Sequence, residues 1–476
     1  MCIERPFTPL IAGALLFVLL SGCATVRPQT RLDEVQSQVG ARTGQQVAWH
    51  QGDEDRQWTE SAVKTLLQDG MTAEEAVQIA LINSPALQAT YERLGIVQAD
   101  LVQAGLAENP TLSLQYLSGN AGNIFEGAIV QDFVSLFTLS AGRKIGAAGA
   151  RQATLEVSQA VTDRAAEVRA AYFSVVADAQ SLELLQQVAN ATAAGAELAA
   201  RQYAAGTLAQ RDQLAQQSLY GQTIAEAARA EAQLAADRER VNRLLGLSGD
   251  QTQWSVPQRL PELPARLPAL EDVEAVAVSQ RLDLAAANAE VETLARVSGL
   301  TRSTRWLRFL GVGVAYKREP GNENFFGPEV ELELPLFDQG QSRLARAQAE
   351  LLAAERRLEQ LAVEIRSEAR EARLRLQSAY QLARHYEEAL LPLQQRLVEE
   401  TTKFYNGMLI GAYDLLLVRQ QQIEIARDYI AASKEFWIAW AELERAVGGR
   451  IELVRADDSR TDPSTPPAAT HDHSKH

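Results

Sequence analysis

Cysteine and histidine are scarce in this chain of 476 residues. The only two cysteines, Cys2 and Cys23, lie close to the N-terminus, so neither a disulfide framework nor a cysteine-based metal site can form in the body of the chain. The five histidines are His50, His385 and three within the last six residues. With so few histidines we find no Cys–His pair in the body and no Ser/His/Asp set, which argues against nucleophilic catalysis.

Aromatic residues and positive charge are also in short supply. Aromatics make up 6% of the chain and the net charge is −15. Binding of nucleic acid is therefore disfavoured, because neutralising phosphates requires clustered Lys and Arg. No glycine-rich phosphate loop stands between a strand and a helix, and the many Glu residues lie on helical faces with Arg nearby, the usual pattern of a solvated surface. We predict that the protein is not an enzyme and that helices pack on one another through small residues.

The one long apolar run is LIAGALLFVLL at residues 10–20. Eleven residues are too few to span a bilayer but suit the core of a signal peptide. The run ends in Leu-Ser-Gly-Cys, which resembles a bacterial lipoprotein cleavage box, and Ala24 resembles the outer-membrane sorting pattern. We expect a signal peptide over 1–22, a lipid on Cys23 and an extended segment over 23–70; the alternative is an ordinary signal peptide with a chance cysteine.

Proline is nearly absent from two long stretches. There is none from Thr111 to Val256, and only Pro392 from Leu336 to Gly449. Within them, apolar residues recur at spacings of three and four, which predicts helices from Ser140 to about Tyr203 and from Gly340 to about Phe404. Each would be about 90 Å long, at 1.5 Å per residue. No globular domain of ordinary size holds such a helix, so coiled-coil-like packing with a solvated side is expected.

Each long helix follows a predicted β-hairpin. In EVELELPLF (329–337), Val and Leu alternate with Glu329, Glu331, Glu333 and a proline, and VQDFVSLF (130–137) occupies the same place 200 residues earlier. Gly- and Asn-rich turns precede both. We expect hairpins over 111–137 and 311–337, hence an internal duplication with repeats at 71–255 and 270–450 joined by a Pro-rich linker at 256–269. The Glu face would line a water-filled lumen; a soluble hairpin with one wet face is the alternative.

Each long helix ends in a glycine-containing break, at 203–214 and 404–417. We pair the two breaks residue by residue, with the second one residue longer between its glycine and its aspartate. The pairs are Tyr203 with Phe404, Gly206 with Gly407, and Asp212 with Asp414.

The order of these features resembles the TolC-type outer membrane factors (the outer membrane efflux protein family), in particular their lipoprotein branch. The resemblance covers about residues 70–450 and is carried by Leu136-Phe137 and Leu336-Phe337, by Gly142 and Gly340 after them, by the two breaks, and by SPALQA at 84–89. Four strands cannot close a barrel, and open strand edges cannot face lipid, so several chains must combine.

The resemblance implies a mainly α-helical fold with a small membrane β-barrel contribution. Three chains, a homotrimer, would form a twelve-stranded barrel in the outer membrane on a long helical tunnel, with most of the chain periplasmic. The function would be a passive exit duct for an inner-membrane pump of the RND type, joined through a periplasmic adaptor (membrane fusion protein). No cofactor is expected beyond the covalent lipid and a transported metal ion.

The resemblance also places the periplasmic gate and the adaptor docking site at the two breaks. Asp414 matches an acidic family position and would be the single charged tier of the gate, because Leu409 and Leu417 stand where some members carry a basic and an acidic residue. Leu409, Ile410, Tyr413 and Leu417 would make the gate hydrophobic. Tyr413 and Leu417 could equally serve only to pack helices together.

The last segment, 451–476, has the composition of a disordered tail. His471, His473 and His476 could bind Cu, Ni or Zn, or could be chance residues of a flexible end. The second break, YNGMLIGAYDLL, also resembles heavy-metal efflux members. We therefore expect heavy-metal cations such as copper as the substrate, with organic toxicants or drugs as the alternative and, from a different class, a lipid-anchored periplasmic coiled-coil scaffold.

Overall fold

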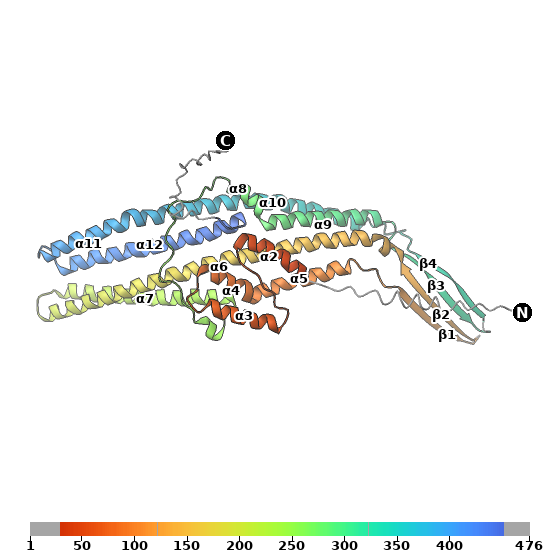
Figure 1. The fold of residues 1–476 in the computed structure, drawn as a ribbon, viewed down its shortest axis with the longest axis horizontal. Coiled ribbons are helices and arrows are strands. Elements are labelled where there is room, and N and C mark those ends of the chain that lie inside the picture. Colours follow the sequence, from red (N-terminus) through yellow and green to blue (C-terminus); the bar gives the residue numbers. More distant parts are fainter. Residues whose placement is uncertain (1–28, 121, 322, 452–476) are drawn as a thin grey trace, which may run out of the picture. The chain divides into compact units, whose positions relative to one another are not determined.

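The computed structural model describes residues 29–120, 122–321 and 323–451 (Figure 1). Cys23 and the three tail histidines lie outside these residues. The described chain falls into two compact units. Unit 1 holds residues 29–38, 89–159 and 282–361 apart from 121 and 322, and unit 2 holds residues 39–88, 160–281 and 362–451.

Unit 1 contains a four-stranded antiparallel sheet in the order β1-β2-β3-β4. Its strands are β1 (Thr111–Gly119), β2 (Gly122–Asp132), β3 (Leu310–Glu319) and β4 (Glu323–Leu332). The two predicted hairpins are therefore present, and they join through β2 and β3, with Val130 opposite Gly313. Strands β1 and β4 are left as the two edges of the sheet.

Both hairpins are shorter than the predicted 111–137 and 311–337. Helix α6 (Phe133–Ala204) starts directly after Asp132, whose carboxylate accepts hydrogen bonds from the backbone N–H of Val134 at 2.9 Å and of Ser135 at 3.1 Å. Asp132 is thus the N-cap of α6. A carboxylate cap of this kind favours a helix from the next residue on, so the strand ends here although the alternating sequence pattern had predicted that it continues to residue 137. In the second hairpin, β4 ends at Leu332 and irregular chain leads to α10.

The long helices exceed the expectation. Helix α6 runs for 72 residues without interruption. The second long helix consists of α10 (Gln341–His385), a π-helical segment (Tyr386–Leu390) and α11 (Leu391–Asn406). Pro392 explains the π-helical segment, because proline lacks the N–H that would bond to the carbonyl four residues back and its ring crowds that carbonyl.

The other helices are shorter. They are α2 (Gln29–Thr43), α3 (Asp53–Leu66), α4 (Ala73–Asn83), α5 (Pro85–Gln103), α7 (Gln210–Leu245), α8 (Val273–Gln280), α9 (Leu282–Thr304) and α12 (Ala412–Val447). Helices α2 and α3 correct the expectation of an extended segment over 23–70. Val35 and Val39 of α2, and Thr59 and Val63 of α3, are buried at a spacing of four, a periodicity that the polar composition obscured.

The core of unit 2 contains several of the chain's few aromatic residues. Phe436, Trp437 and Trp440 of α12 are buried, and the Trp437 ring stacks on Phe173 of α6 at a centroid distance of 5.3 Å. The Trp437 indole N–H donates to the carbonyl of Pro261, so the Pro-rich linker is held against this core. Among the described helices, none is both long and apolar enough to cross a membrane.

Two helices of unit 2 end in a left-handed glycine. Gly246 follows α7 with φ +72°, and Gly448 follows α12 with φ +80°, both left-handed. A Cβ at Gly246 would lie 2.6 Å from Pro85 Cδ, so glycine is also the only residue that fits there.

A carboxyl pair joins α6 to α7 in unit 2. The carboxyls of Asp178 and Asp237 interact with each other, and Lys434 of α12 donates to Asp178 Oδ1 at 2.8 Å. Burial, reinforced by the interaction with Asp237, raises the pKa of Asp178 to about 6 in spite of Lys434. Burial of Asp237 acts in the same direction on its own pKa, but the interaction with Asp178, the Gln233 amide and the charges of Lys434 and Arg240 lower it overall.

The raised pKa of Asp178 predicts a pH-dependent stability. A carboxyl whose pKa is higher in the folded than in the unfolded chain stabilises the fold fully below its unfolded pKa, and this contribution is lost as pH rises through about 6. Asp178→Asn should therefore reduce the fall in unfolding free energy between pH 4 and 7 by on the order of 1 kcal/mol. Denaturant unfolding in detergent at several pH values measures this.

The control for this experiment is Asp250→Asn, which changes an exposed aspartate of the same unit. It should keep the wild-type pH dependence. A slope that is the same in wild type and Asp178→Asn would contradict the assignment.

Candidate functional site

The four-stranded sheet has one apolar and one polar face, because directly opposed residues on neighbouring strands point to the same side. The register assigns alternate residues of all four strands to each face. Ten large apolar side chains of one face are exposed: Leu112, Leu114, Tyr116, Phe125, Ile129, Val314, Tyr316, Phe326, Val330 and Leu332. A continuous apolar surface of this kind marks contact with a partner or a membrane.

The other face carries most of the sheet's charged residues and has small residues near its middle, together with the apolar side chains of Leu117, Ile124, Val130 and Phe325. Its charged residues are one lysine and six carboxylates, namely Lys317 and Glu126, Asp132, Glu319, Glu323, Glu329 and Glu331. Lys317 pairs with Glu126 at 3.1 Å and Glu319 at 3.0 Å. The lysine therefore leaves this face with a net charge of −5, whereas the apolar face has one charged residue, Arg318.

The predicted lumen residues occupy two kinds of position. Glu329 and Glu331 lie on the polar face opposite Gly313 and Gly311. Glu333 lies beyond the end of β4, where Arg308 pairs with it at 3.2 Å. Sequence reasoning had identified only this strand as acidic and missed Glu126 and Glu319; the weaker alternation of the other strands, which interleave Gly and Ala, hid their contribution.

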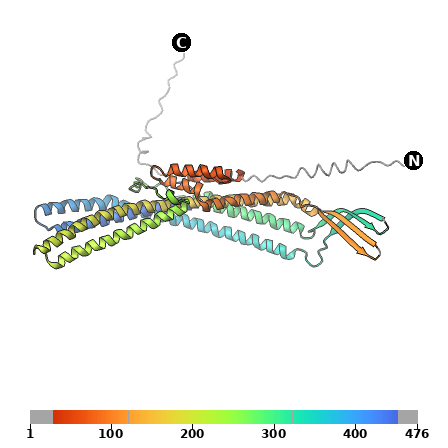
Figure 2. The same ribbon diagram turned by 90° about the horizontal axis from the view of Figure 1, so that it is seen from below.

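The two helix breaks share one geometry in unit 2, where they lie at the same end of the unit (Figure 2). After α6, the N–H of Gly206 bonds to the carbonyl of Tyr203 and that of Thr207 to Gln202, both at 2.9 Å. After α11, the N–H of Met408 bonds to Tyr405 at 2.9 Å and that of Leu409 to Phe404 at 3.0 Å. Both are Schellman turns, which place one residue in the left-handed region.

This geometry corrects the predicted pairing of the breaks. The left-handed residue is Gly206 (φ +73°) in the first break and Met408 (φ +58°) in the second, not Gly407, whose φ is −77°. Tyr203 therefore corresponds to Tyr405, and the breaks have equal length, since Asp212 and Asp414 each follow the left-handed residue by six positions. The alignment had paired the two glycines, whereas in the second break a methionine takes the left-handed position.

The second break presents apolar side chains to solvent. Met408 is 93% exposed and Leu409 is 72% exposed, and Leu417 and Phe404 are also exposed. In the first break Tyr203 is exposed. A non-glycine residue in the left-handed region costs roughly 1–2 kcal/mol and is worth attention as a functional position.

Tyr413 and Asp414 have defined roles at the start of α12. The Tyr413 hydroxyl donates to Gln202 Oε1 at 2.7 Å and so ties the second break to the end of α6. Burial, and then the charge of Asp212, raises the pKa of Tyr413. The Asp414 carboxylate accepts the N–H of Gly411 at 2.9 Å and remains exposed, so it caps α12 with its charge still open to solvent.

The described histidines do not form a metal site. His50 Nε2 lies 2.8 Å from Thr59 Oγ1, a contact between α3 and the segment before it. Within residues 29–120, 122–321 and 323–451, no three His, Cys, Asp or Glu side chains are grouped so that they could hold a metal ion.

The similar proteins include a metal-resistance protein and several outer membrane proteins. No family model matches the sequence. The chain is 26% identical over 283 residues to the cobalt-zinc-cadmium resistance protein CzcC of Cupriavidus metallidurans, a match that covers 58% of this chain and 66%, just under two thirds, of that protein.

Solved structures share the fold. They include CusC (TM-score 0.64, 14% identity, 82% of this chain and 92% of that one) and the outer membrane protein VceC of Vibrio cholerae (0.65, 16%, 80% and 97%). The outer membrane channel CmeC of Campylobacter jejuni is a third (0.66, 13%, 85% and 90%). At these identities the likeness is one of fold.

The matched geometry of the breaks yields a paired prediction. Met408→Gly should stabilise the second turn by about 1 kcal/mol, because glycine takes a positive φ without strain, and Gly206→Ala should destabilise the first by a similar amount. Hydrogen exchange of the Leu409 amide should slow about fivefold in the first variant, and that of Thr207 should quicken about fivefold in the second. Unchanged exchange at Leu409 in Met408→Gly would show that the turn is not strained.

Proposed function

The chain has the fold of the TolC-type outer membrane factors, and on that premise we propose that it is the outer membrane exit duct of a tripartite efflux system. It would conduct substrate passively from an inner-membrane pump of the RND type and a periplasmic adaptor to the exterior. The sheet with one exposed apolar face, one acidic face and two open edges is the observation that carries this proposal.

Strand length and open edges support closure of the sheet by several copies. The four strands have 9 to 11 residues, which suits tilted strands in a bilayer. In lipid, the unpaired backbone groups of β1 and β4 would each cost several kcal/mol. Pairing β4 of one copy with β1 of the next removes both edges, and three copies supply the twelve strands of a closed barrel. The apolar face would then meet lipid.

The acidic face supports cations as the substrate. If this face lines the lumen, its net charge of −5 per chain would raise the local concentration of cations in the pore and lower that of anions. The name of the relative CzcC points to heavy metals as well. We propose heavy-metal cations such as copper as the cargo, with the tail histidines His471, His473 and His476 as collecting ligands and a lipid on Cys23 as the membrane anchor.

The breaks would form the periplasmic gate and the docking site of the adaptor. In a trimer, Asp414 would be repeated as a ring of three carboxylates, while Leu409, Ile410 and Leu417 would supply an apolar constriction. Tyr413 would hold the two breaks together through Gln202. Exposed apolar side chains at Met408 and Leu409 suit a contact with a partner protein.

The lumen charge predicts the ion selectivity. Replacing both carboxylates of β4, Glu329→Gln with Glu331→Gln, should lower the cation-to-anion permeability ratio of the reconstituted protein by about twofold or more, because less negative charge faces the pore. Planar-bilayer reversal potentials measure the ratio. Glu54→Gln with Glu60→Gln, an equal change of charge at two exposed residues of α3 outside the sheet, is the control and should leave the ratio as in the wild type.

A deletion strain tests the cargo. Loss of the gene should increase sensitivity to copper, zinc, cobalt or cadmium salts more than to organic toxicants, and the full-length protein should restore growth. A version that ends at Arg450 should restore it only in part if the tail histidines collect metal. Sensitivity to organic compounds alone would support the drug-efflux alternative, and a protein that conducts no ions in bilayers would support the scaffold.

A further inference from the structure

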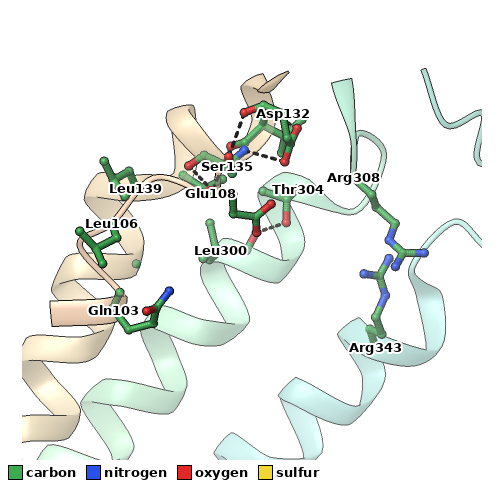
Figure 3. A pocket seen from close by; sticks show the side chains of 14 residues that line it. Gln103, Leu106, Glu108, Asp132, Ser135, Leu139, Leu300, Thr304, Arg308 and Arg343 are labelled. Atoms are coloured by element: carbon green, nitrogen blue, oxygen red, sulfur yellow. Dashed lines mark hydrogen bonds between the residues drawn. The ribbon is translucent and has the colours of Figure 1, made fainter. Parts of the chain in front are cut away.

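A cavity in unit 1 lies at the end of the sheet where the chain passes into the helices. Its volume is about 470 Å³, within the range of sites for small molecules. The end of α5, the first turns of α6, the last turns of α9 and the start of α10 line it (Figure 3). It therefore sits where, on the proposed function, the barrel meets the periplasmic surface of the membrane.

Two arginines form one side of the cavity. Figure 3 shows the guanidinium groups of Arg308 and Arg343 pointing toward one another. Arg308 pairs with Glu333 at 3.2 Å and lies 3.7 Å from Asp338. Arg343 has no hydrogen bond or ion pair with any residue that the structure describes. Two guanidiniums that converge repel each other, and an anion bound between them would relieve this repulsion.

Carboxylates stand on the other side. Asp132 lines the cavity while its oxygens cap α6. Glu108 also lines it, and of Glu108 only the backbone carbonyl has a hydrogen-bond partner, the Gln131 amide at 3.1 Å. Its side-chain carboxylate is thus available to a ligand. The cavity offers positive charge on one side and negative charge on the other, which suits a zwitterion with an anionic and a cationic end.

Exposed aromatic side chains stand next to residues of the cavity wall in the sequence. Phe337 is 93% exposed and precedes Asp338, and Phe137 is 77% exposed two residues after Ser135 of the cavity wall. Trp306, half exposed and two residues before Arg308, carries the Arg305 guanidinium 4.4 Å from its ring centroid. Exposed Trp and Phe beside Arg are typical of the membrane–water interface. A ligand for this place would therefore be amphipathic.

We propose that the cavity binds the headgroup of a phospholipid with a phosphate and a primary ammonium, as in phosphatidylethanolamine. Arg308 and Arg343 would hold the phosphate, the carboxylates of Glu108 and Asp132 would accept from the ammonium, and the acyl chains would lie on the exposed aromatic surface. This assignment rests on the proposed placement of the sheet in the outer membrane. The bound lipid would fix the depth of each chain in the bilayer.

Native mass spectrometry of the delipidated protein in detergent tests the proposal. Phosphatidylethanolamine, phosphatidylcholine, phosphatidylglycerol and inorganic phosphate are added separately. Wild type should bind phosphatidylethanolamine at least about fivefold more tightly than phosphatidylcholine, whose quaternary ammonium donates no hydrogen bond. Arg343→Gln should weaken both phosphatidylethanolamine and phosphatidylglycerol about tenfold, because both contain the phosphate.

Glu108→Gln distinguishes the two ends of the ligand. It should reduce phosphatidylethanolamine to the level of phosphatidylcholine and leave phosphatidylglycerol unchanged or slightly tighter. Arg346→Gln removes an arginine one turn further along α10, where it pairs with Glu350 outside the cavity, and should bind lipid as the wild type does.

Three results would overturn the assignment: wild-type binding by Arg343→Gln, equal affinity of the wild type for the ethanolamine and choline lipids, or full displacement of lipid by millimolar phosphate. Conductance is recorded on the same preparations. A channel that conducts ions but does not discriminate between the lipids refutes the headgroup site alone. A protein that does not conduct while it still discriminates refutes the proposed duct and leaves the site standing.

Discussion

Strands β1 and β4 each expose a row of backbone N–H and C=O groups, while the face that they complete is covered with exposed Leu, Val, Phe and Tyr. These two features conflict in a single chain. The apolar face favours contact with lipid, but the unpaired backbone groups of the edges are too costly to place there. Pairing of edges between copies satisfies both at once. The proposed assembly, acidic lumen and headgroup site all follow from this requirement.

The transitions between strand and helix depend on a few short-range contacts. Asp132 caps α6 and also accepts the backbone N–H of Leu310 at 3.3 Å, so one carboxylate both starts the longest helix and connects the two hairpins. Its charge lies on the polar face of the sheet and beside the cavity. The same residue thus contributes to helix formation, to the pairing of the hairpins and to the electrostatics of the proposed pore.

Unit 2 adds to its aromatic core an ion-pair network, of which Arg169 and Glu444 are buried while Glu74 and Arg450 are half exposed. Arg169 of α6 pairs with Glu444 of α12 at 2.7 Å and with Glu74 of α4 at 3.2 Å, and Arg450 also bonds to Glu74. Burial raises the pKa of Glu444, which Arg169 opposes. Burying charges is costly unless they are paired, so we expect the buried Arg169–Glu444 pair to select which helices meet more than to add stability.

The sequence alone determined the succession of hairpin, long helix and break, because alternation, the lack of proline and the placement of glycine are local signals. It also identified Glu329, Glu331 and the two breaks. Only the tertiary structure decided that Asp132 ends a strand as a cap, that Met408 and not Gly407 is left-handed, and that residues 29–66 bury a helical stripe. Likewise, Glu126 and Glu319 join Glu329 and Glu331 on one face only through strand pairing, and Arg343 meets Arg308 only through the fold. The shared acidic face and the approach of the two arginines depend on contacts between residues distant in the chain, which no local pattern encodes. The Asp132 cap and the Met408 turn are short-range, but composition alone does not show which residue takes the capping or left-handed conformation.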